Sequence, residues 1–189
     1  GIIPMAQASD GGGSIRIPAS CCGLFGLKPT RARTPLGPVS LEGWGGQSIF
    51  HCVSVSVRDS AALLDVTSGA EKGAPYRSAH QEKSFLEQIN IDPGNLKIGL
   101  IETPEVDIHN DVKEVLNSTI KLCESLGHSV ESTKLNFSSE EISLAIVTII
   151  SANVAYVAKS QSLETNRDFS NDFFENVTLQ MAKNGNNFS

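Results

Sequence analysis

The chain has 189 residues, 40% of them hydrophobic, which is enough for one domain or the larger part of one. Its 15 basic and 21 acidic residues give a net charge of −6, and its longest basic cluster is Arg31-Ala32-Arg33. Because phosphate contacts need a concentrated basic face, this charge pattern argues against nucleic acid as the main partner.

A glycine loop is the first informative segment. The apolar residues Ile2-Ile3-Pro4-Met5 predict a buried strand, which leads to the run Ala8-Ser9-Asp10-Gly11-Gly12-Gly13-Ser14. Consecutive glycines are costly in a regular element but suit a loop of positive φ, in which backbone N–H groups converge on one point. A serine beside such donors has the arrangement that acyl transfer needs, with a nucleophile on one side of a carbonyl and oxyanion donors on the other.

Other interpretations of this loop are weaker or fail. On composition alone, a glycine run before a serine is more often a flexible turn than a catalytic loop. A phosphate-binding P-loop would need a lysine after Gly13, and the G-x-S-x-G elbow of hydrolases would need a glycine where Arg16 stands. The surrounding sequence therefore decides between a turn and a nucleophile.

The rest of the chain alternates predicted strands and helices, as is typical of an α/β fold. Residues 29–46 are rich in Gly and Pro and predict a long ordered loop, and Ser56 begins a capping-box helix that Gly69 ends. Residues 71–95 are polar and predict a surface excursion. A strand at 96–101, an amphipathic helix from Asn110 to Gly127 and a strand at 128–135 predict a βαβ unit with parallel strands.

Residues 142–158 are the candidate for a membrane span. They contain Ser143, Thr148, Ser151 and Asn153, and they fall short of the roughly 20 apolar residues that a bilayer demands. We therefore expect a helix that is buried on most sides and either lines a substrate tunnel or belongs to the core. Residues 168–183 have helical spacing, and their aromatic side chains are expected to pack.

Cysteines and histidines do not form a recognisable metal motif. Because no C-x-x-C spacing and no histidine at ligand spacing occurs, we expect no zinc site and four buried, reduced thiols at Cys21, Cys22, Cys52 and Cys123. The histidines are scattered, and we expect a surface or capping position for each of His51, His80, His109 and His128.

Residues 8–30, ASDGGGSIRIPASCCGLFGLKPT, closely resemble the signature of the amidase signature family, which reads roughly G-[ST]-D-x-G-G-S-I-R-x-P-A-x-x-C-G-x-x-G-L-K-P-T. Residues 51–76 and 96–130 resemble later blocks of the same family. The resemblance implies an α/β fold, part of the amidase signature fold, with a mixed β-sheet core covered by helices. Residues 1–189 are expected to be the central portion of a single amidase domain, truncated at both ends.

The resemblance also implies a serine hydrolase of amides that uses a Ser–cisSer–Lys triad and no cofactor or metal. At the matching positions Ser14 is the acyl-forming nucleophile, Asp10 and Arg16 are an ion pair that supports the loop, and the oxyanion hole is made by the backbone amides of Gly11, Gly12, Gly13 and Ser14. The family's lysine and bridging serine are expected outside this chain, because they precede the nucleophile in the family and no family lysine context surrounds Lys28, Lys72, Lys83 or Lys97.

Two classes of function follow. The first is a serine amidase that acts on a linear or cyclic small-molecule carboxamide. Gly11 and Ile17 are most similar to the family branch that contains 6-aminohexanoate cyclic dimer hydrolase, whereas the tRNA-dependent amidotransferase A subunit usually has glutamine at the position of Ile17. The second is a non-catalytic truncated product or a fragment that binds a ligand or a partner. We expect a cytoplasmic protein with a small-molecule amide substrate and with neither nucleic acid nor membrane as a partner. A homodimer is a further hypothesis.

Overall fold

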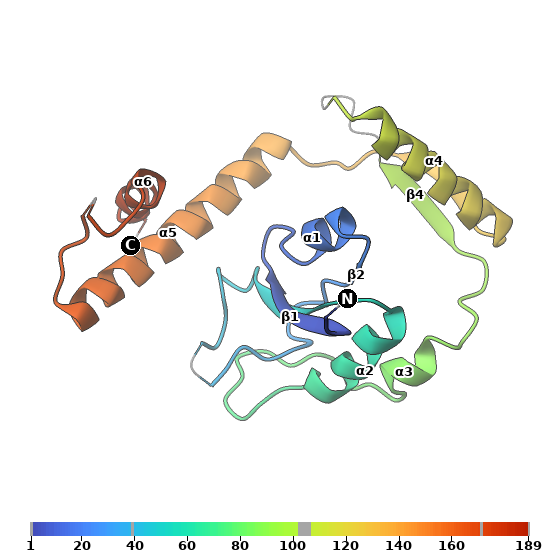
Figure 1. Ribbon diagram of the computed structural model, residues 1–189, viewed down its shortest axis with the longest axis horizontal. Helices are drawn as coiled ribbons and strands as arrows, with labels where there is room; N and C mark the ends of the chain where they lie inside the picture. The colour runs from blue at the N-terminus through green and yellow to red at the C-terminus, as the bar shows by residue number, and fades with distance from the viewer. Residues whose placement is uncertain (1, 39, 102–106, 171, 189) are drawn as a thin grey trace. The chain divides into compact units, whose positions relative to one another are not determined.

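The computed structural model describes residues 2–38, 40–101, 107–170 and 172–188 (Figure 1). The chain divides into two compact units, one made of Gly1–Asn90 with Ser143–Ser189 and the other of Ile91–Ile142. Each unit is described by itself.

A three-stranded antiparallel sheet organises the first unit. Its strands are β1 (Met5–Asp10), β3 (Ile49–Ser54) and β2 (Phe25–Gly26), in the order β1-β3-β2. Along β1 and β3 the register pairs Met5 with Ser54 and Asp10 with Ile49, so β1 ends at Asp10. The prediction of a buried strand at residues 2–5 is wrong, because pairing with β3 begins at Met5 and leaves Ile2 and Ile3 exposed.

Short helices lie around this sheet. Helix α1 (Arg16–Cys21) follows the glycine loop, and α2 (Val57–Thr67) begins after Ser56, whose Oγ accepts a hydrogen bond from the Asp59 amide at 3.1 Å. The predicted surface excursion contains one further short helix, α3 (Phe85–Gln88). The carboxylate of Asp65 accepts hydrogen bonds from the first amides of α3, which fastens α3 to α2.

The second unit is the predicted βαβ element. Strand β4 (Lys97–Ile101) and strand β5 (Ser129–Thr133) are parallel, with Lys97 opposite Ser129, and helix α4 (Asn110–Ser125) connects them. Gly127 follows α4 with a φ of 90°, a conformation that favours glycine at the end of a helix. The α/β prediction and the parallel pairing are therefore confirmed.

Helix α5 (Ser139–Thr165) is longer and more exposed than its sequence predicted. It has 27 residues and a mean hydropathy of 1.7 over its most apolar window, so by length and composition alone it could cross a membrane. The prediction of burial on most sides is wrong for this part of the chain, since its buried residues are Ser151, Ala155 and Ala158, which share one face. Helix α6 (Asn176–Gly185) packs there, and a Cβ at Gly185 would overlap the Ser151 carbonyl.

Cysteine burial also differs from the prediction. Cys52 is buried on β3, but Cys21 and Cys22 are exposed at the end of α1, because that helix buries Ala19 and turns its other face outward. Cys123 is half-buried, and all four thiols are free.

Candidate active site on the glycine loop

The loop between β1 and α1 presents Ser14 to solvent. Ser14 is exposed, whereas its neighbours Gly13 and Ile15 are buried, and Ile15 has no exposed surface. Gly13 has a φ of 123°, and a Cβ there would lie 2.6 Å from the Cδ1 of Ile17, so both backbone and space require glycine. The hydrogen bond from the Ile17 amide to the Gly13 carbonyl, at 2.8 Å, starts the helix. The turn therefore exposes the Ser14 hydroxyl between two buried residues, Gly13 and Ile15.

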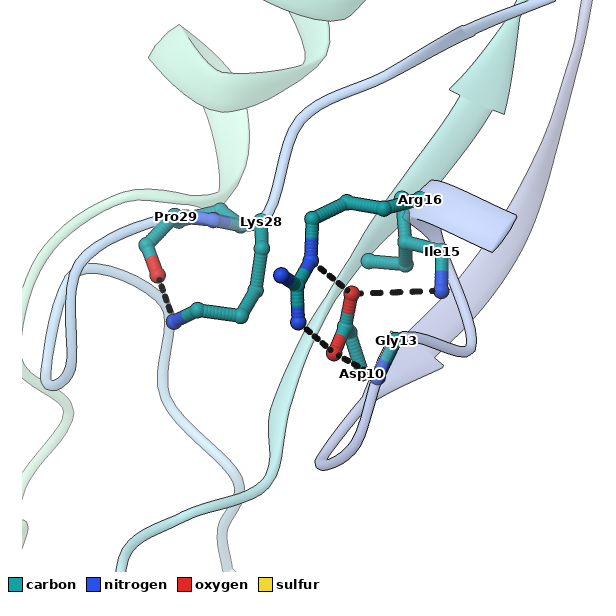
Figure 2. Close-up of polar contacts among 6 residues, drawn as sticks. All are labelled: Asp10, Gly13, Ile15, Arg16, Lys28 and Pro29. Atoms are coloured by element: carbon teal, nitrogen blue, oxygen red, sulfur yellow. Dashed lines mark hydrogen bonds and ion pairs between the residues drawn. The ribbon is translucent and has the colours of Figure 1, made fainter. Parts of the chain in front are cut away.

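The Asp10 carboxylate joins the ends of the loop (Figure 2). One oxygen, Oδ1, accepts from the Gly13 amide at 2.7 Å and from Nη2 of Arg16 at 3.0 Å. The other, Oδ2, accepts from Nε of Arg16 at 2.9 Å and from the Ile15 amide at 3.4 Å. The expected ion pair is therefore present, and it is bidentate.

The charge state of Asp10 follows from these bonds. Its side chain has no exposed surface, and burial alone would favour the neutral acid. The hydrogen bonds from Arg16 outweigh burial and, with the Gly13 amide, lower the pKa of Asp10 to about 2. Asp10 is consequently an anion at neutral pH, and the same pairing raises the pKa of Arg16.

One of the four predicted oxyanion donors is already engaged. The Gly13 amide points to the Asp10 carboxylate, and an N–H aimed at that oxygen is not directed at a substrate carbonyl. The expectation for Gly13 is corrected on this ground: its amide supports the loop. The amides of Gly11, Gly12 and Ser14 donate no hydrogen bond to Asp10 and stay candidates for the oxyanion hole.

Sequence reasoning missed Trp44, which lies against the loop. A Cβ built on Gly11 would be 2.7 Å from Cε3 of Trp44, so the indole touches the Gly11 backbone. The same indole lines an apolar groove of about 530 Å³ in the first unit, together with Phe50, Val154, Val157, Phe169 and Phe174. The available signal was the single tryptophan of the chain, set among glycines in the segment Gly43-Trp44-Gly45-Gly46.

Lys28 and His51 have hydrogen-bond partners other than Ser14. Nζ of Lys28 donates to the Pro29 carbonyl at 2.9 Å, a contact that Figure 2 draws. His51 is buried rather than at the surface, and its Nε2 lies 2.7 Å from Oγ of Ser60. In the part of the chain that the structure describes, no three His, Cys, Asp or Glu side chains group closely enough to hold a metal ion.

Comparisons with known proteins show the family to which the chain belongs. Residues 1–188 match the Amidase family model. The 6-aminohexanoate-cyclic-dimer hydrolase of Pseudomonas sp. (strain NK87) is 40% identical over 103 residues, which are 52% of this chain and 20% of that protein. A glutamyl-tRNA(Gln) amidotransferase component from Staphylococcus haemolyticus is 32% identical over 137 residues, covering 71% of this chain and 28% of that protein.

Solved structures give the same result. A structure of 6-aminohexanoate cyclic dimer hydrolase superposes with a TM-score of 0.87 at 29% identity, covering 97% of this chain and 39% of that one. A bacterial aryl acylamidase superposes with a TM-score of 0.85 at 20% identity, covering 100% of this chain and 40% of that one, and shows the fold alone. The chain belongs to the amidase family, whose signature it carries, and it spans between a fifth and two fifths of these relatives.

Proposed function

We propose that the protein containing this chain is a serine amidase and that the chain supplies its nucleophile, Ser14. The placement of Ser14 carries the proposal: it is exposed on a loop whose two ends are held by one buried carboxylate. Catalysis by a hydroxyl requires a fixed orientation toward the carbonyl, and a glycine loop without such bonds would not provide one. Membership of the amidase family supports amide hydrolysis as the reaction.

In the proposed reaction the Ser14 oxygen attacks the carboxamide carbon, its proton passes to the base, and the carbonyl oxygen becomes an oxyanion. The amides of Gly11, Gly12 and Ser14 donate to that oxygen. Collapse of the intermediate breaks the C–N bond, and the amine leaves with the proton. Water then hydrolyses the ester, which releases the carboxylic acid and restores the hydroxyl. We assign neither the base nor the bridging serine to a residue of this chain.

A linear or cyclic small-molecule carboxamide is the proposed substrate class. The similarity to 6-aminohexanoate cyclic dimer hydrolase supports it, and so does the groove beside the loop. Val154 and Val157 of α5 line this groove with Trp44, which contacts Gly11, so an apolar part of a substrate bound at Ser14 has an apolar surface nearby. The prediction that this helix lines a substrate tunnel becomes part of the proposal.

Substitution of Ser14 tests the function. In the enzyme that carries this chain, Ser14→Ala is expected to lower the kcat for 6-aminohexanoate cyclic dimer and for a hexanoyl p-nitroanilide by more than about a hundredfold, because nucleophile and base act as a unit. Ser20→Ala is the matched control, since Ser20 is also exposed but lies on α1 outside the loop. Retention of more than about a hundredth of the activity by Ser14→Ala would show that the nucleophile is another residue.

A further inference from the structure

Trp44 has an unusual backbone conformation. Its φ is 54°, and the two residues that follow, Gly45 and Gly46, have φ values of 59° and 79°. A bulky side chain rarely occupies this left-handed region, so the surrounding structure must hold it there. A tight turn does so: Gly43 and Ser48 form an antiparallel bridge, and the Gln47 amide donates to the Trp44 carbonyl at 3.1 Å.

The turn places the indole on the Gly11 α-carbon. A Cβ at Gly11 would lie 2.7 Å from Cε3 and 2.9 Å from Cζ3 of Trp44, which are closer than real Cβ contacts. Gly11 is not among the glycines of positive φ, so it is required by space and not by backbone conformation. A Cβ at Gly12, one residue on, meets nothing within 4 Å. The close contact is therefore specific to Gly11.

The Asp10 carboxylate joins the ends of the loop but makes no hydrogen bond with its first two glycines. Asp10 binds the amides of Gly13 and Ile15, which fixes the end next to α1. The contacts of Asp10 do not include the amides of Gly11 and Gly12, and consecutive glycines have more conformational freedom than any other residues. The Trp44 indole packs on Gly11 and so restricts the backbone of the first two glycines.

We propose that Trp44 is a positioning residue for the oxyanion loop: its indole supports the Gly11 backbone and so keeps the amides of Gly11 and Gly12 directed at the carbonyl oxygen of the substrate. The inference rests on the proposed function, because it needs an oxyanion at Ser14. Trp44 acts through Gly11 and takes no part in bond making.

The test is a double-mutant cycle in the enzyme that carries this chain, with a hexanoyl p-nitroanilide as substrate. Gly11→Ala is expected to lower kcat by roughly tenfold to a hundredfold with little change in KM, because a displaced donor weakens binding of the transition state alone. Trp44→Ala lowers kcat about tenfold, and Trp44→Phe, which keeps a ring, stays within about threefold of the parent enzyme. Val66→Ala is the control, because Val66 is exposed and lies on α2.

The decisive variant combines Gly11→Ala with Trp44→Ala. Removal of the indole leaves room for the new methyl group, so the double variant is expected to fall no more than about twofold below Trp44→Ala. A loss equal to the product of the single losses overturns the proposal, and so does a Trp44→Ala enzyme that melts earlier but keeps its kcat per folded molecule. If Gly11→Ala does not fold, the comparison of the double variant with Trp44→Ala still decides.

Failure of this inference is separable from failure of the proposed function. An inactive Ser14→Ala enzyme together with unchanged kcat in the Gly11 and Trp44 variants overturns the role of Trp44 alone. An active Ser14→Ala enzyme overturns the nucleophile itself, whatever the Trp44 variants do.

Discussion

Arg16 and Asp10 form a bidentate ion pair across the glycine loop, although the Arg16 side chain is 55% exposed and Asp10 has no exposed surface. Ser14 lies between the two residues in the sequence, so this ion pair links the end of β1 to the first turn of α1. A buried carboxylate without partners would favour the protonated state, and Arg16 with the amides of Gly13 and Ile15 prevents this. Loop geometry and charge state consequently depend on the same contacts.

Arg16→Ala is expected to lower stability and kcat together. Removal of the guanidinium leaves a buried anion with two amide donors, at a cost of about 2 kcal/mol once the exposure of Arg16 is taken into account. Thermal unfolding and kcat are measured with one neutral and one acidic amide substrate. Arg16→Lys keeps the charge but lacks the planar guanidinium, so its Tm and kcat are expected to lie between those of wild type and Arg16→Ala. A loss confined to the acidic substrate at an unchanged Tm would instead indicate that Arg16 binds a substrate carboxylate.

The pairing of Asp10 also predicts an acid-sensitive fold. Its pKa is about 2 in the folded protein against an ordinary value of 3.8, so the unfolded chain takes up the proton first as the pH falls. The contribution of the pair is complete above about pH 4 and is lost as the pH falls toward 2, by on the order of 1–2 kcal/mol. The free energy of unfolding of wild type and Asp10→Asn, measured with denaturant between about pH 4 and 2, tests this loss. Asp172→Asn is the control, because Asp172 is exposed. Parallel pH profiles for wild type and Asp10→Asn would contradict the assignment.

Local signals in the sequence predicted several elements correctly. The Ser56 cap, the period of α4 and the glycine after it are short-range features, and the structure contains all three. The ion pair between Asp10 and Arg16 was predicted from the family resemblance, and the structure contains that too.

Long-range contacts account for what the sequence did not predict. The placement of Trp44 on Gly11 depends on a turn that brings together residues more than thirty positions apart, and no local pattern encodes that distance. The sequence also does not show which of the four consecutive backbone amides points at the Asp10 carboxylate. In the structure it is the Gly13 amide. The burial of His51 follows from its place on the central strand β3, opposite Ala8.

His51 is expected to destabilise the fold in mild acid. Burial lowers its pKa, and Ser60 Oγ lies 2.7 Å from its Nε2, while its buried Nδ1 has no hydrogen-bond partner among the described residues. The unfolded chain binds a proton near pH 6.5 and the folded chain only at lower pH, so stability is complete above about pH 6.5 and falls below it. Tm measured from pH 8 to 5 should fall less in His51→Gln than in wild type. The exposed His80→Gln serves as control and should follow wild type.

The isolated 189-residue chain is expected to react slowly, if at all, with a serine-directed fluorophosphonate. Without a base to take its proton, the Ser14 hydroxyl is expected to be a weak nucleophile. In the described part of the chain, the hydrogen-bond partner of Lys28 Nζ is the Pro29 carbonyl and not the Ser14 hydroxyl. Intact-mass analysis after incubation gives the labelled fraction, and the enzyme that carries the chain, labelled in parallel, shows that the reagent is competent. Rapid stoichiometric labelling of the isolated chain that disappears in Ser14→Ala and persists in Ser20→Ala would place a working base within these residues.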